Sequence, residues 1–108
     1  MVSSEISQIF YYVPSSHVDE VNAALFEAGA GNIGHYDSCA FVSSGVGQFR
    51  PLEGSRPFIG NQGSIEKVEE LKVELVCARE NVGHVIEILV EKHPYESPAY
   101  GVIHLEKY

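Results

Sequence analysis

The histidines are the first residues that could bind a metal or transfer a proton, and they are dispersed along the chain. Two of them have a carboxylate three residues further on, His84 with Glu87 and His93 with Glu96. Neither pair supplies the three or four ligands that zinc requires, and no two histidines have HxH or HxxxH spacing. Each histidine is therefore interpreted as a surface or strand-end residue, and the sequence assigns no metal ligand. The five are His17, His35, His84, His93 and His104.

The candidate nucleophiles and carboxylate pairs give no better evidence of catalysis. Ser55 and Ser64 lie in a segment with few catalytic side chains, and neither cysteine is next to a histidine. Glu69 and Glu70 are adjacent and are interpreted as the solvated start of a strand. The sequence assigns no catalytic residue, and we expect that the chain is not an enzyme by itself.

The stretch GQFRPLEGSRPFIGNQG, residues 47–63, is the most unusual segment. Its glycine spacing does not fit a phosphate-binding loop, because the GxG of residues 45–47 has its next glycine at Gly54 and no Lys-Ser/Thr follows. Disorder is disfavoured, because four large apolar side chains would stay in water. We expect an ordered loop or extended hairpin, packed by its own aromatic residues or by a neighbouring subunit. As an assembly element, it would bury Phe49 and Phe58 against that subunit and place Arg50 and Arg56 at the rim.

Composition limits the class of protein. The chain has 108 residues, 44% of them hydrophobic, and a net charge of −8, which suit a globular domain and disfavour binding to nucleic acid or an anionic membrane. No apolar run reaches membrane-spanning length, and the N-terminus lacks the features of a signal peptide. Cys39 and Cys77 lie far apart and are predicted to be reduced and buried on separate strands. These features predict a cytoplasmic protein.

Apolar periodicity predicts two similar halves. In the first half, a strand around Ile9–Val13 ends at Pro14, and a helix capped by Ser15 or Ser16 follows until the glycines near residue 30. A second strand is predicted over residues 35–44. In the second half, residues 68–77 alternate as a strand, a helix ends near residue 93 before a proline, and residues 99–108 form the closing strand.

This order predicts the ferredoxin-like βαββαβ fold, an α+β sandwich. Its four-stranded antiparallel sheet has both helices on one face and a long connection between the second and third strands. One face stays uncovered, and the aromatic residues must be shared between the two faces. A small domain with such a face usually buries it against another subunit, so we expect an oligomer. The shared side chains are Tyr11, Tyr36, Phe41, Tyr100 and Ile103.

The stretch HPYESPAY, residues 93–100, resembles the His-Pro-Tyr-Glu-x-Pro element of the CutA-like divalent-cation tolerance proteins. Together with residues 13–41, 45–63 and 67–77, it resembles the domain inserted in YqfO-type members of the NGG1-interacting-factor-three-like family. The resemblance covers nearly the whole chain and implies a single CutA-like domain over residues 1–108, a free-standing version of the insert, that assembles as a trimer. It also implies that the family's two-metal site, and the GTP-cyclohydrolase-type activity associated with it, belong to flanking domains.

Two functions follow as alternatives. The first is a non-enzymatic oligomeric module that binds a small ligand, a metal ion or a protein at subunit junctions, with positive charge from Arg50 and Arg56. The second is a metal-dependent hydrolase with a site built across chains from His35, His93 and Glu96. No cofactor is predicted, although a divalent metal is left open. The candidate ligand and assembly residues are His35, Tyr36, Gly47, Phe49, Arg50, Glu53, Arg56, Phe58, His93, Tyr95, Glu96 and Tyr100.

Overall fold

The computed structural model describes residues 5–108, and residues 1–4 of the predicted domain lie outside them. The elements follow the order β1 (Ile6–Pro14), α1 (Val18–Glu27), β2 (Phe41–Phe49), β3 (Glu66–Ala78), a 3₁₀ turn (Arg79–Asn81), α2 (Val82–Lys92) and β4 (Tyr100–His104). All three strand pairings in the described part are antiparallel, and the sheet order is β2-β3-β1-β4. This arrangement is the predicted ferredoxin-like sandwich.

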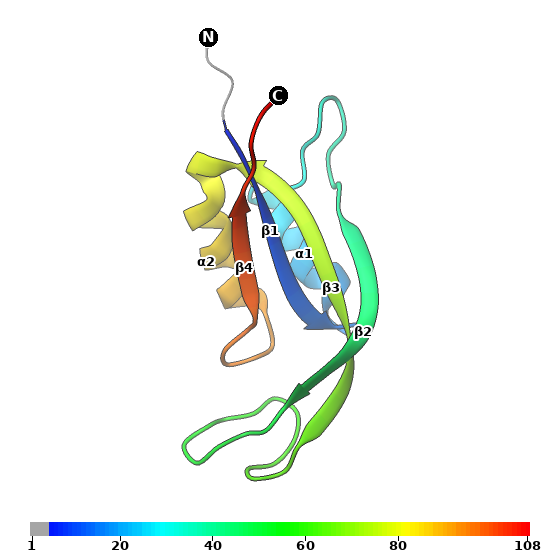
Figure 1. The fold of residues 1–108 in the computed structure, drawn as a ribbon, viewed down its shortest axis with the longest axis vertical. Coiled ribbons are helices and arrows are strands. Elements are labelled where there is room, and N and C mark those ends of the chain that lie inside the picture. The colour runs from blue at the N-terminus through cyan, green and yellow to red at the C-terminus, as the bar shows by residue number, and fades with distance from the viewer. Residues whose placement is uncertain (1–4) are drawn as a thin grey trace.

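Both helices lie behind the sheet in the view of Figure 1 and leave the face toward the viewer without a helix. Residues that stand directly opposite each other in an antiparallel pair share a face, so the register assigns each side chain. Ile9 and Tyr11 on β1 stand opposite Leu75 and Val73 on β3, and all four are buried. The alternating positions belong to the face without helices, which we call the open face.

The core lies between the sheet and the two helices. Val21 and Leu25 of α1 and Val85 and Leu89 of α2 are fully buried against the strands. Each such side chain contributes about 1.5–3 kcal/mol when it leaves water. The buried hydroxyl of Tyr11 donates a hydrogen bond to Oδ1 of Asn22 on α1. Burial raises the pKa of this phenol.

The start of α1 differs from the prediction. Neither Ser15 nor Ser16 caps it: His17 occupies the N-cap position, without a side-chain hydrogen bond to the helix. The carboxylates of Asp19 and Glu20 lie in the first turn, where they interact favourably with the helix dipole.

The helix ends agree with the prediction. Gly29, with φ of 105°, follows α1 in a left-handed conformation that glycine adopts at low cost. His93 is extended, as a residue before proline prefers, and ends α2.

The second strand was predicted in the wrong place. Residues 35–40 belong to a loop, and β2 runs over Phe41–Phe49. The loop is closed by two backbone hydrogen bonds of Gly31, from its N–H to Val76 O and from Cys39 N–H to its carbonyl oxygen. Inside it, Gly34 and Ser38 have positive φ, which a strand does not accommodate. Cys39 is consequently part of a loop and only half-buried, whereas Cys77 is buried in β3 as predicted.

The two ends of the described chain lie side by side. Ser7 stands opposite His104 in the β1–β4 pairing, and its hydroxyl is hydrogen-bonded to Nδ1 of that histidine at 2.7 Å. The N–H of Leu105 donates to the carbonyl oxygen of Ile6 at 3.0 Å. The long β2–β3 hairpin extends the molecule at the opposite end and gives it extents of 54 × 24 × 23 Å. No helix among residues 5–108 is long and apolar enough to cross a membrane.

Candidate functional site

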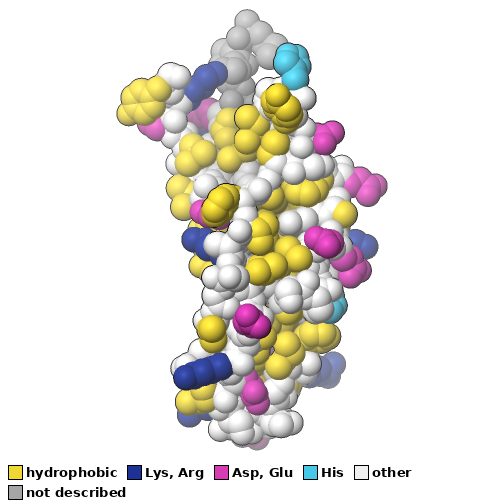
Figure 2. All heavy atoms as spheres, turned by 90° about the vertical axis from the view of Figure 1, so that its right-hand side faces the viewer, with side chains coloured by type: hydrophobic (Ala, Val, Ile, Leu, Met, Phe, Trp, Pro, Cys, Tyr) yellow, Lys and Arg dark blue, Asp and Glu magenta, His cyan; other side chains and the backbone are white. Residues whose placement is uncertain are grey.

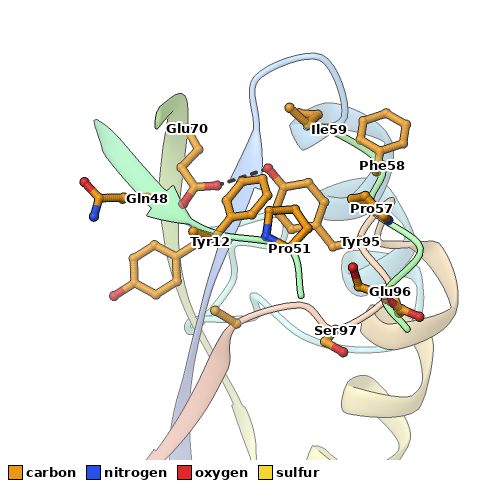
Figure 3. A pocket seen from close by; sticks show the side chains of 13 residues that line it. Tyr12, Gln48, Pro51, Pro57, Phe58, Ile59, Glu70, Tyr95, Glu96 and Ser97 are labelled. Atoms are coloured by element: carbon orange, nitrogen blue, oxygen red, sulfur yellow. Dashed lines mark hydrogen bonds between the residues drawn. The ribbon is translucent and has the colours of Figure 1, made fainter. Parts of the chain in front are cut away.

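A cavity of about 260 Å³ lies at the end of the molecule away from the chain ends, where two loops meet the sheet. One loop, residues 50–65, joins β2 to β3, and the other, residues 93–99, joins α2 to β4. Figure 3 shows the side chains that surround the cavity. The lining consists of Tyr12, Gln48, Phe49, Pro51, Ser55, Pro57, Phe58, Ile59, Glu70, Tyr95, Glu96, Ser97 and Ala99.

His93 fixes the 93–99 loop to the sheet. Its side chain is 6% exposed, and Nε2 donates a hydrogen bond to the carbonyl oxygen of Tyr12 at 2.6 Å. Nδ1 accepts a hydrogen bond from the backbone N–H of Tyr95 at 3.0 Å. These partners require the neutral imidazole with its proton on Nε2. Burial lowers the pKa of His93, the hydrogen bond to Tyr12 opposes this shift, and nearby His17 adds to it.

Tyr95 lies at the centre of the aromatic residues of the site. Its ring centroid is 4.9 Å from that of His93 and 6.2 Å from those of Phe49 and Phe58. Phe58 also contacts His17, edge to face, at 5.3 Å. The two phenylalanines of the 47–63 stretch therefore pack on aromatic residues of their own chain, which is one of the two arrangements expected from the sequence.

The phenol of Tyr95 points toward Glu70 on the open face of β3 (Figure 3). It donates a long hydrogen bond of 3.4 Å to Oε2 of Glu70. Burial raises the pKa of Tyr95, and the charge and hydrogen bond of the carboxylate raise it further. Gly47 makes room for this carboxylate, because a Cβ at that position would lie 2.0 Å from Oε1 of Glu70.

The 50–65 loop is ordered by its own backbone bonds. Gly63 N–H donates to Pro51 O at 2.7 Å, and Ser55 donates to Leu52 O through both its N–H and its hydroxyl. A hydrogen bond joins the two loops: the N–H of Arg56 donates to Oε1 of Glu96 at 2.9 Å. The loop thus forms one wall of the cavity.

The structure brings together part of the predicted site. Phe49, Phe58, Tyr95 and Glu96 line the cavity, and His93 and Gly47 position its walls. The other predicted residues do not line it. Arg50, Glu53 and Arg56 have exposed side chains, and Tyr100 lies on the helix-covered face at the start of β4, opposite Tyr11.

The loop between α1 and β2, to which His35 and Tyr36 belong, lies at the opposite end of the molecule (Figure 1). His35 is at the tip of a tight turn that two backbone hydrogen bonds between Ile33 and Tyr36 close. Within one chain it is therefore far from His93 and Glu96. Among residues 5–108 no group of three His, Cys, Asp or Glu side chains could hold a metal ion, and both ring nitrogens of His93 already have partners.

Glu70 is one of two cavity-lining residues of interest that sequence reasoning missed. It was interpreted as part of a solvated strand start, but it is half-buried and accepts the Tyr95 hydrogen bond. The alternation along β3 could have placed it, because Glu70 and Lys72 fall on the face of the sheet opposite to Leu71 and Val73. Tyr12 was missed for the same reason, as it alternates with buried Tyr11 and Val13 on β1.

Sequence relatives cover the chain but are much longer. Over 100 residues, 93% of its length, the chain is 44% identical to a protein of Halalkalibacterium halodurans named GTP cyclohydrolase 1 type 2 homolog. It is 42% identical over 102 residues to the Bacillus subtilis protein of the same name. The chain spans 27% of the length of each of these relatives. No protein-family profile matches the chain.

Solved structures give the same result and define the fold. A Bacillus cereus protein related to NIF3 superposes on 99% of this chain with a TM-score of 0.83 and 38% identity, and the match covers 27% of that protein. CutA1 of Ehrlichia chaffeensis, a divalent ion tolerance protein, superposes with a TM-score of 0.70 at 18% identity and is covered over 87% of its length. The chain thus has a CutA-like fold and is homologous to one segment of the NIF3-related proteins, and its sequence predicts both.

Proposed function

We propose that this homologue of a NIF3-related segment is a non-enzymatic, self-associating binding module that assembles through the open face of its sheet. The observation that carries this proposal is the apolar character of that face. Phe41 on β2 is 67% exposed and Ile103 on β4 is 48% exposed. They stand opposite Glu74 and Gln8, which alternate with core residues, so both belong to the open face.

The apolar side chains extend over much of the molecule. Figure 2, which looks onto the side that carries β2, shows hydrophobic side chains along the full length of the surface. β2 and β4 are the edge strands of the sheet, and their outer backbone groups have no strand partner among residues 5–108. Exposed apolar patches and open edges of this kind are typical of surfaces that bind another chain.

Charge on the open face favours a second copy of this chain as the occupant. Lys72 and Glu74 are neighbours on this face of β3, and the ammonium group of Lys72 lies 5.1 Å from the ring centroid of Phe10. A surface with both charge signs beside apolar side chains can pair with itself. The trimer, the single domain over residues 1–108 and the cytoplasmic location remain predictions.

The names of the relatives refer to whole proteins, of which this chain spans 27%. Within the described part of the chain, no group of three His, Cys, Asp or Glu side chains could hold a metal ion. We therefore propose no hydrolase activity for this chain.

Size-exclusion chromatography with light scattering tests the assembly. We expect three copies for the wild-type chain and a shift to monomer for the double variant Phe41→Asp, Ile103→Asp. The matched control is Val90→Asp, because Val90 is 46% exposed but lies on α2. A wild-type monomer at micromolar concentration, or a double variant that assembles like the control, contradicts the proposal. Circular dichroism checks that each variant folds.

A further inference from the structure

We propose that the cavity between the 50–65 and 93–99 loops binds a small organic cation, an ammonium ion that carries alkyl groups. This proposal does not depend on self-association. It is based on three properties of the cavity: aromatic walls, unpaired negative charge and a volume that fits a small molecule.

Four aromatic side chains line the cavity, Tyr12, Phe49, Phe58 and Tyr95, and the last three contact one another. The planes of Phe49 and Phe58 are tilted by 52° and 49° to that of Tyr95, with centroids 6.2 Å from it. Tyr95 is held between them by the hydrogen bond of its backbone to His93. Phe49, Phe58 and Tyr95 all line the cavity, and the face of an aromatic ring attracts a cation.

The charge in the cavity is negative. Glu70 and Glu96 line it, and no Lys or Arg side chain does. The ion pair between Arg79 and Glu5, at 2.8 Å, involves neither carboxylate. The Glu70 carboxylate accepts a long hydrogen bond, of 3.4 Å, from the phenol of Tyr95. It therefore retains the capacity to accept from a ligand N–H or to balance a quaternary ammonium ion.

Ligand chemistry argues against a metal ion and an anion as the occupant, and size limits the occupant to a small molecule. A cavity of about 260 Å³ accommodates a molecule of a few heavy atoms. A divalent metal ion requires several oxygen or nitrogen ligands, and the described residues offer no group of three. An anion would lie beside two carboxylates in a chain of net charge −8.

The first experiment compares choline with 3,3-dimethyl-1-butanol, which has the same shape but no charge. Binding to the wild-type chain is measured by titration calorimetry and by the NMR shifts of the Tyr95 ring. We expect choline to shift the Tyr95 signals and to bind at least about tenfold more tightly than the alcohol. Equal affinity for the two molecules, or no choline binding at tens of millimolar, overturns the proposal. Tighter binding of inorganic phosphate than of choline also overturns it.

The second experiment tests the named residues. Glu70→Gln and Phe58→Leu should each weaken choline binding by about tenfold. Glu69→Gln is the matched control, because this exposed neighbour on β3 carries the same charge but does not line the cavity. A control variant that loses as much affinity as Glu70→Gln overturns the assignment of this carboxylate. If a variant does not fold, the comparison of choline with the alcohol on the wild-type chain still decides.

Discussion

The Nε2–H of His93 donates to the carbonyl oxygen of Tyr12 across 2.6 Å, and so joins the end of α2 to β1. The two residues are 81 positions apart in the sequence, so this bond closes a long-range contact. The same imidazole accepts the N–H of Tyr95 and packs against its ring. One buried side chain thereby holds the 93–99 loop, and with it one wall of the cavity.

We predict that the chain loses stability as the pH falls below about 6.5, the ordinary pKa of histidine. Burial lowers the pKa of His93 in the folded chain. Between the lowered and the ordinary pKa, the unfolded chain binds a proton that the folded chain does not bind. The free energy of unfolding is therefore highest above the ordinary pKa and falls as the pH drops through this window. Urea unfolding between about pH 8 and about pH 5.5 measures it.

Two variants test whether His93 causes this pH dependence of stability. His93→Gln should be less stable than wild type at neutral pH and should lose most of the dependence. His84→Gln, which changes an exposed histidine of α2, should retain it. Equal pH profiles for the two variants would show that another group is responsible.

Gly47→Ala should disturb the Glu70–Tyr95 contact, whereas Gly45→Ala should not. A Cβ at Gly47 would lie 2.0 Å from Oε1 of Glu70, so the carboxylate must move, while a Cβ at Gly45 meets no atom within 4 Å. The pKa of Tyr95 should fall toward its ordinary value only in Gly47→Ala, because burial and Glu70 both raise it and the change removes the Glu70 part. The NMR shift of the Tyr95 Cζ against pH measures this. Gly45→Ala should gain about 0.5 kcal/mol from the smaller entropy of its unfolded state.

Tyr95→Ala should loosen the 50–65 loop without unfolding the sheet. The phenol ring is the common contact of Phe49 and Phe58, and truncating it removes the surface on which both rest. We expect faster amide hydrogen exchange in the loop and unchanged exchange in β1 and β3, which hydrogen exchange with mass spectrometry resolves. Tyr36→Ala is the control, because this tyrosine is 75% exposed at the other end of the molecule. Protected loop amides in Tyr95→Ala would contradict the central position of the ring.

The two thiols should differ in reactivity. Cys39 is half-buried in a loop, whereas Cys77 is buried in β3 and burial raises its pKa. We expect a thiol reagent to modify Cys39 in the folded chain and Cys77 only after denaturation, because the thiolate is the reactive form. Mass spectrometry of the labelled peptides identifies the site. Rapid labelling of Cys77 in native buffer would mean that β3 opens locally.

The sequence predicted the elements of the fold correctly where the alternation of apolar and polar residues, or the helical spacing of apolar residues, was strong. β3 alternates from Leu71 to Cys77, and its buried residues are those that the pattern selects. β2 was misplaced because its own signal is weak: it contains Gly45 and Gly47, which resemble loop residues, and no residue of it is buried. Its position depends on backbone pairing with β3, which the sequence pattern does not encode.

The site was only partly predictable for a related reason. The sequence identified the aromatic residues of the two loops, Phe49, Phe58 and Tyr95. It could not reveal that Glu70 lies among them, because that placement depends on the register between strands and on the space at Gly47. The positive charge expected from Arg50 and Arg56 at subunit junctions stays a prediction, and neither residue lines this cavity.

The hydrogen bond from the N–H of Leu105 to the carbonyl oxygen of Ile6 holds the start of β1 and the end of β4 together at one end of the molecule. A longer protein that contains such a domain would leave and re-enter its own fold at nearly the same point. The folded domain then fixes the distance between the two points at which the host chain continues. A flexible insert of about a hundred residues would leave that distance free to vary. For a flexible insert of n residues, the entropic cost of holding its two ends together grows with length as about (3/2)RT ln n. A domain with adjacent ends can thus be gained or lost by a host protein with little strain on the host's own structure, while the loops that line its cavity lie at the far end.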